Sequence, residues 1–151
     1  MNQTDPSQGS VSATVLVADD DPNDRALLRY AAAVANPDFV LRFVQNGIEA
    51  LQFLKGEKPF GERSHQAPLR LVVLDVKMPK MGGLEVLDWL KHSEGFHELK
   101  TVILSGYDGP DIAAAVKSAG AIYCRKPVSV EPWVEFIRGL DALLKQQAVE
   151  H

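Results

Sequence analysis

Apolar segments of two kinds alternate along this chain, and that alternation constrains its fold more than any other feature. The first kind is short and rich in β-branched or aromatic residues, and it occurs at 14–18, 39–44, 69–75, 100–105 and 121–125. The second kind carries apolar residues at helical spacing, and it occurs at 22–35, 47–55, 83–92, 110–119 and about 130–147. Strands that alternate with helices in this way indicate a parallel sheet covered by helices on both faces.

The predicted architecture is a doubly wound α/β fold. We expect a five-stranded parallel sheet of flavodoxin-like order 2-1-3-4-5, with helices on both faces. The runs LVVL (71–74) and TVIL (101–104) are apolar throughout, as strands buried on both sides require. Proline stands where the first turn of a helix tolerates it, at Pro22, Pro110 and Pro132, which supports the predicted helix starts.

One domain accounts for the length of 151 residues. We place it at 14–147, between a flexible N-terminal tail at 1–13 and a C-terminal tail at 148–151, and expect no output domain. The net charge of −4 argues against nucleic acid or an anionic membrane surface as the main partner. A single cysteine, Cys124, excludes an internal disulfide and favours a reducing compartment, so we expect a cytoplasmic protein.

Acidic residues follow the predicted strands at one edge of the sheet, beginning with the stretch TVLVADDDPND. In this fold, ligands bind beyond the carboxyl ends of the strands, at the switch point between the first and third strands. The polar residues that end strands there are Asp19, Asp20, Asp21, Asp75, Ser105 and Lys126. Carboxylates about 4 Å apart repel by roughly 4 kcal/mol at an effective dielectric near 20, so they call for a cation. Hard oxygen ligands of this kind suit Mg²⁺, while Asp21 is expected to cap the helix that follows it.

The same residue types predict phosphoryl chemistry. A carboxylate is a competent nucleophile toward a phosphoryl group and forms an aspartyl phosphate. Phosphoryl transfer depends mainly on positioning and on neutralising the charge of the equatorial oxygens. Mg²⁺, the Lys126 ammonium and the Ser105 hydroxyl or nearby backbone N–H groups could each hold one oxygen.

The order of these residues resembles the response-regulator receiver family over about residues 14–146. The matching elements are Asp19-Asp20, LDVKMPKMGG around Asp75, VILSG with Ser105, and RKP with Lys126-Pro127. The resemblance implies that Asp75 accepts phosphate from a phosphohistidine on a sensor histidine kinase or histidine phosphotransfer protein. It implies Mg²⁺ ligation by Asp20 and Asp75 directly, by Asp19 mainly through water, and by the backbone carbonyl of Lys77.

The resemblance also implies a conformational switch. The Ser105 hydroxyl would move toward the phosphoryl group, and Tyr123 would change rotamer with it. Lys126 would bridge to the phosphoryl group, and the bond between Lys126 and Pro127 is expected to be cis. The change would reach a downstream protein through the face made by the fourth helix, the fifth strand and the fifth helix.

The last predicted helix carries a wider apolar stripe than one core face requires. Three of its residues, Trp133, Phe136 and Leu143, form a candidate surface for a partner or for a homodimer.

Two regions depart from the usual pattern of the family. Lys77 and Tyr107 are bulky residues beside the expected phosphoryl position, and we expect them to slow autodephosphorylation by hindering the attacking water.

The segment 56–70 is long for a connection in this architecture. It resembles the insertion in small single-domain receivers associated with phytochrome-like sensor kinases.

Other functions remain open at the level of sequence. A haloacid-dehalogenase-like Mg²⁺-dependent phosphatase uses an aspartate nucleophile too, but it carries a second aspartate two residues later, where this chain has Lys77. Its acidic pair also comes last in the chain, whereas here it comes first. A pseudo-receiver that binds partners without phosphate is the other alternative. We expect a signalling phosphoacceptor and not an enzyme.

Overall fold

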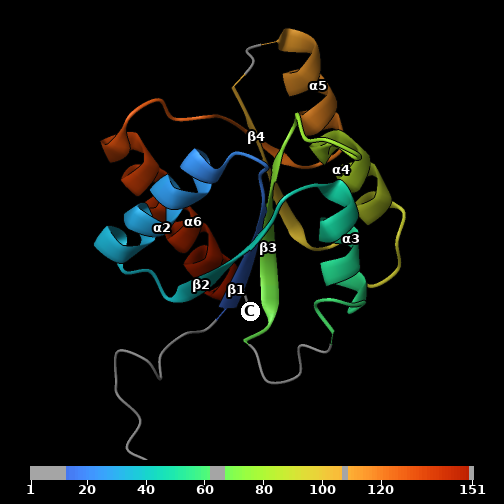
Figure 1. Cartoon of the computed structure of the whole chain (residues 1–151), viewed down its shortest axis with the longest axis horizontal. Helices are drawn as coiled ribbons and strands as arrows, with labels where there is room; N and C mark the ends of the chain where they lie inside the picture. The colour runs from blue at the N-terminus through green and yellow to red at the C-terminus, as the bar shows by residue number, and fades with distance from the viewer. Residues whose placement is uncertain (1–12, 62–66, 107–108, 150–151) are drawn as a thin grey trace, which may run out of the picture.

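The computed structural model describes residues 13–61, 67–106 and 109–149, and it contains the predicted parallel sheet. Its strands are β1 (Ala13–Ala18), β2 (Phe39–Val44), β3 (Leu69–Asp75), β4 (Lys100–Ser105) and β5 (Ile122–Arg125). All neighbouring strands pair in parallel, in the order β2-β1-β3-β4-β5, which confirms the predicted fold class. The sheet runs through the centre of the molecule with helices on either side (Figure 1).

Two groups of helices cover the two faces of the sheet. The helices are α2 (Pro22–Ala35), α3 (Gly47–Lys55), α4 (Gly83–Lys91), α5 (Pro110–Ser118) and α6 (Val130–Val149). Helices α2 and α6 lie together on one face, and α3 and α4 lie on the other (Figure 1). Alternate residues of β1 face opposite cores: Val15 and Val17 pack with α2 and α6, while Leu16 and Ala18 pack with α3 and α4.

The observed ends of the elements stay close to the predicted ones. Strand β1 begins at Ala13, one residue before the predicted strand, and α6 continues to Val149, two residues past the predicted helix. The domain bounds of 14–147 stay a prediction. Most of the tails predicted at 1–13 and 148–151 lies outside the described residues. The expected cap of α2 is confirmed, because the Asp21 side chain accepts a hydrogen bond from the Asn23 N–H at 2.9 Å.

Helix α6 corrects the predicted partner surface. Trp133 is only 1% exposed and belongs to the core, so it cannot form part of a surface patch. Phe136 packs edge-on against Trp133 with ring centroids 6.1 Å apart, and both Phe136 and Leu143 are partly buried against the same core. The wide apolar stripe has a structural cause, since α6 packs against α2 as well as the sheet.

The connection after α3 returns toward the helix before it leaves the described region. Gly56 ends α3 with a positive φ of 72°, and Phe60 packs edge-on against Phe53 at a centroid distance of 5.6 Å. Residues 62–66 of the segment predicted as an insertion lie outside the described residues. In the part of the chain that the structure describes, every helix is too short or too polar to cross a membrane.

Candidate functional site

The carboxyl ends of four strands bring the predicted site residues together. Asp19 follows β1, Asp75 ends β3, Ser105 ends β4 and Lys126 follows β5. The backbone N–H of Lys126 donates to the carbonyl of Ser105 at 2.8 Å, which fixes the end of β5 beside β4. A cavity of about 610 Å³ opens at this edge. The residues that line it are Asp20, Asp21, Pro22, Asp75, Lys77, Ser105, Gly106 and Lys126.

Asp19 is fully buried and contacts Lys126, which lines this cavity. Its Oδ1 accepts the Asp21 N–H at 2.9 Å, and its Oδ2 lies 3.3 Å from Lys126 Nζ. Despite that proximity, Oδ2 makes no hydrogen bond with any described residue. Burial raises the pKa of Asp19 to about 7, against the opposing effects of the Asp21 N–H and of Lys126. An orphaned, buried carboxylate oxygen is a group that a cation would satisfy.

Lys126 pairs with three carboxylates that line this cavity or lie beside it. Its Nζ lies 2.9 Å from Asp75 Oδ2 and 2.6 Å from Asp24 Oδ2, in addition to the contact with Asp19. Burial on its own would lower the pKa of Lys126, but the bonds to Asp24 and Asp75 outweigh it and hold the pKa above its usual value. The pKa of Asp75 lies above its usual value because burial disfavours the charged carboxylate. The hydrogen bond from Lys126 opposes this effect but does not outweigh it.

The predicted metal ligands fit a divalent cation. Asp19, Asp20 and Asp75 each offer a carboxylate oxygen, and these atoms all lie within 4.8 Å of one another. Oxygen donors of this kind are those that Mg²⁺ takes in proteins. The backbone N–H of Lys77 donates to Asp75 Oδ1 at 3.4 Å, and Lys77 also lines the cavity. Metal ligation by its backbone carbonyl stays a prediction.

The two predicted switch residues lie at different depths. Ser105 is 2% exposed and lines the cavity, whereas Tyr123 is half-buried and packs against the core on the face of the sheet that α3 and α4 cover. Their coupled motion stays a prediction. Tyr107, which was expected to hinder the attacking water together with Lys77, lies outside the described residues.

The expected cis bond between Lys126 and Pro127 is wrong. The cis peptide bond among the described residues is that between Lys58 and Pro59, and Lys126–Pro127 is trans. Trans is the intrinsically preferred isomer by roughly 0.5–1 kcal/mol. In this isomer the Lys126 N–H still reaches Ser105, and its side chain still reaches Asp75.

Asp24 is the site residue that sequence reasoning missed. It lies in the first turn of α2, and its side chain is only 15% exposed where it meets Lys126. The available signal was its position after the aspartate cluster, near the start of a helix that begins at the cavity edge.

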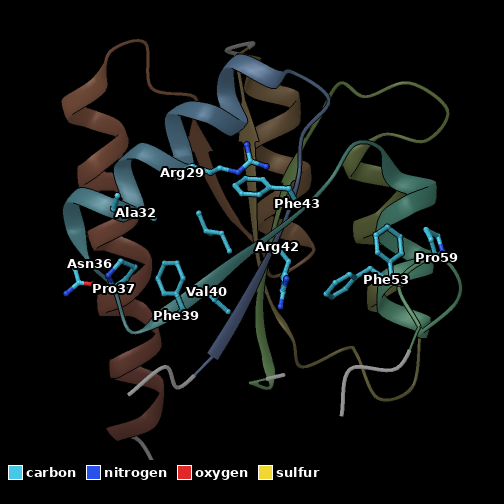
Figure 2. Close-up of a pocket in the computed structure, with 13 residues that line it drawn as sticks. Arg29, Ala32, Asn36, Pro37, Phe39, Val40, Arg42, Phe43, Phe53 and Pro59 are labelled. Carbon is cyan, nitrogen blue, oxygen red and sulfur yellow. The ribbon is translucent and has the colours of Figure 1, made fainter. Parts of the chain in front are cut away.

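A second groove, of about 850 Å³, lies beside the edge strand β2 and has different chemistry (Figure 2). Arg29 lies over the ring of Phe43 at 4.5 Å from its centroid, and Arg42 also lines this groove. The described residues that line it include no carboxylate. The cation and the aspartate chemistry predicted from the sequence therefore concern the first cavity and not this groove.

Gly83 allows α4 to begin against the end of β3. Its N–H donates to the Val76 carbonyl at 3.2 Å, and a Cβ added to it would collide with the Asp75 carbonyl oxygen. We expect Gly83→Ala to lower the free energy of unfolding by about 2 kcal/mol, because the backbone of the site must shift. Urea unfolding measures this. Gly139→Ala is the control, because a Cβ there meets nothing within 4 Å, and it should be neutral or stabilising. Equal effects of the two substitutions would contradict the steric argument.

Hard oxygen ligands, a carboxylate beside a half-buried lysine, and a 2-1-3-4-5 parallel sheet together define an α/β module that handles phosphoryl groups. The sequence pattern of the response regulator receiver domain matches residues 15–138. The chain therefore belongs to the response regulator receiver family, whose members act in two-component signal transduction, accept a phosphoryl group and bind Mg²⁺ at an acidic pocket.

Individual relatives agree with this assignment. An uncharacterized 14.6 kDa protein of Leptolyngbya boryana is 32% identical over 115 residues, which cover 76% of this chain and 79% of the relative. A probable cyclic di-GMP phosphodiesterase of Vibrio cholerae is 30% identical over 118 residues, 78% of this chain but 24% of the relative. The chain thus spans about a quarter of that relative's length. The crystal structure of a response regulator in red light signaling of R. palustris is 32% identical with a TM-score of 0.76. It covers 85% of this chain and 90% of that one.

Proposed function

We propose that Asp75 is the phosphoryl acceptor of this receiver and that Mg²⁺ supports the transfer. The observation that carries the proposal is the position of the Asp75 carboxylate. It lines the cavity, lies 2.9 Å from Lys126 Nζ, and has Asp19 and Asp20 oxygens within 4.8 Å. A nucleophile, a fixed cation and a set of metal ligands are thereby gathered around one point.

The donor we propose is a phosphohistidine on a sensor histidine kinase or a histidine phosphotransfer protein. An Asp75 oxygen forms the new bond to phosphorus, and the bond from phosphorus to the histidine nitrogen breaks. Mg²⁺ held by Asp19, Asp20, Asp75 and the Lys77 carbonyl would neutralise charge on the transferred group. Lys126 would hold one phosphoryl oxygen and the Ser105 hydroxyl another.

The outcome of the transfer would be altered binding to a downstream protein and not an enzymatic reaction. Ser105 would move toward the phosphoryl group and Tyr123 would follow. These movements would shift the equilibrium between conformations of the face formed by α5, β5 and α6. A homodimer is one way to use that face. The similar R. palustris protein acts in red light signaling, which supports a light-sensing kinase as the upstream partner. The single cysteine favours the cytoplasm as the compartment.

The geometry also bears on the alternatives. Lys77 occupies the position where a haloacid-dehalogenase-like phosphatase needs its second aspartate, so this chain lacks that general acid. A pseudo-receiver has no need for a lysine held among three carboxylates, and this chain has one.

Intact mass spectrometry after incubation with acetyl phosphate and Mg²⁺ tests the proposal. We expect the wild-type protein to gain one phosphoryl group that hydroxylamine removes. Asp75→Asn should gain none, and Asp111→Asn, which changes an exposed aspartate at the start of α5, should behave as the wild type. An adduct on the Asp75→Asn variant would place the acceptor elsewhere. No adduct on either protein, with no release of inorganic phosphate, would favour the pseudo-receiver.

A further inference from the structure

The shortest ion pair in the site joins Lys126 to a carboxylate outside the predicted set. Asp24 Oδ2 lies 2.6 Å from Lys126 Nζ, closer than Asp75 Oδ2 at 2.9 Å or Asp19 Oδ2 at 3.3 Å. Both partners are shielded, since the side chain of Asp24 is 15% exposed and that of Lys126 is 17% exposed. A lysine ammonium has three N–H donors, and here hydrogen bonds to Asp24 and Asp75 use two of them.

Asp24 differs from the other two carboxylates in what it can do next. Asp19 and Asp75 belong to the group whose oxygens could share a cation with Asp20, and Asp24 is not part of that group among the described residues. A divalent cation held by that group would occupy oxygens of Asp19 and Asp75 and would leave Asp24 on the lysine. The position of Asp24 is fixed by the start of α2, because Pro22 begins the helix and the Asp21 side chain caps it.

The charge of Asp24 opposes phosphorylation in two ways. Its contact occupies one N–H of Lys126 and neutralises part of the positive charge that would attract a phosphoryl oxygen. Its own negative charge also lies next to the lysine that the incoming anion must approach, and like charges repel most strongly where water is partly excluded. Both effects weaken the binding of a phosphoryl group without changing the nucleophile.

We propose that Asp24 is a positioning residue that competes with the phosphoryl group for Lys126 and so limits the phosphorylated state. The inference rests on the proposed function, because it concerns the same lysine and the same phosphoryl group. In this role a residue of α2, distinct from the metal ligands and from the phosphoryl acceptor, limits the fraction of the protein that is phosphorylated.

Asp24→Asn tests the charge and leaves the geometry in place, since an asparagine oxygen can still accept a hydrogen bond from Lys126. The probe is beryllium trifluoride, a non-covalent mimic of a phosphoryl group on aspartate, titrated by calorimetry at saturating Mg²⁺. Mg²⁺ affinity is measured separately, without beryllium. Asp38→Asn is the matched control, because Asp38 also pairs with a lysine, Lys145 at 3.3 Å, at the other end of the sheet.

We expect Asp24→Asn to bind beryllium trifluoride roughly threefold to tenfold more tightly than the wild type, as removal of one nearby charge implies. Its Mg²⁺ affinity should stay equal or fall, since the site loses negative charge. Tighter binding of beryllium trifluoride without any gain in Mg²⁺ affinity is a result that general loosening of the site would not give. Asp38→Asn should change neither.

Two results would overturn the inference. Equal or weaker beryllium trifluoride binding by Asp24→Asn, with the wild type binding normally, would show that Asp24 does not compete for Lys126, and the proposed function would stand. Failure of the wild type itself to bind beryllium trifluoride in the presence of Mg²⁺ would remove the proposed function and the inference with it.

Discussion

Replacing Lys126 by methionine is expected to lower phosphoryl incorporation from acetyl phosphate at least 100-fold, the loss typical of removing one charge-stabilising donor from an active site. The same change should destabilise the protein by about 3 kcal/mol near pH 8, because it leaves shielded carboxylates without their counter-ion. Methionine keeps the length and flexibility of the side chain, so packing around it changes little. Asp24, Asp75 and Asp19, at 2.6, 2.9 and 3.3 Å from Nζ, all lose their cation.

Lys145→Met is the control for this substitution. Lys145 also contacts two carboxylates, Asp38 at 3.3 Å and Asp141 at 3.1 Å, but its side chain is 60% exposed. Exposed ion pairs contribute roughly 0–1 kcal/mol, so its loss should be small and phosphoryl incorporation should not change. Urea unfolding and intact mass spectrometry give the two readouts. Near-equal effects of Lys126→Met and Lys145→Met on both readouts would show that the buried lysine has no special role.

The fold could be predicted from sequence because each strand carried its own signal. Continuous apolar runs such as 71–74 and 101–104 have few alternatives in a chain of this length. Every predicted strand is present, and β5 begins one residue later than expected, at Ile122. The end of α6 was harder to predict, because the sequence near Val149 contains no glycine or proline that would end a helix.

The site could be predicted because strand ends in a parallel sheet converge whatever the loops do. The order of the strands alone is enough to predict that Asp75, Ser105 and Lys126 lie together. Asp24 depended on something else, the direction in which α2 leaves the cavity and the length of the Lys126 side chain. Local sequence does not specify either one, so the ion pair between Asp24 and Lys126, about a hundred residues apart in the chain, could not be predicted.

The two wrong predictions have different origins. The apolar spacing of α6 predicts a surface position for Trp133, because the helix has more apolar residues than one core face needs, but α6 packs against both α2 and the sheet. That error follows from tertiary packing, which residue spacing does not reveal. The cis Lys126–Pro127 bond follows only from the family resemblance, whereas the dipeptide alone favours the trans isomer that the structure has.

The metal-free protein is expected to lose stability as the pH rises from about 4 to about 7. The pKa of Asp19 is about 7 in the folded protein against an ordinary value of 3.8, so the folded state binds a proton more tightly than the unfolded state across this interval. Stability falls with pH wherever the folded state holds more protons. At roughly 1.4 kcal/mol per pKa unit, the full shift sets an upper limit of about 4 kcal/mol, and we expect about 2 kcal/mol.

Mg²⁺ should reverse this trend. A cation binds the ionised carboxylates, so it competes with the proton and stabilises the folded protein most at high pH. We therefore expect Mg²⁺ to raise the free energy of unfolding markedly at pH 8 and little at pH 5. Urea unfolding with EDTA or with Mg²⁺ at both pH values measures the difference.

Asp19→Asn isolates the group responsible. An amide at this position cannot ionise, so the variant should be more stable than the wild type at pH 8 without metal and should show less pH dependence. It should also gain less from Mg²⁺, since one of the three carboxylates within 4.8 Å is gone. Glu94→Gln, at an exposed carboxylate, is the control and should keep the wild-type profile. A metal-free wild type whose stability rises between pH 4 and pH 7 would contradict the assignment. The sign of that slope decides whether the buried Asp19 is held ionised by Lys126 alone or needs a metal ion to stay charged.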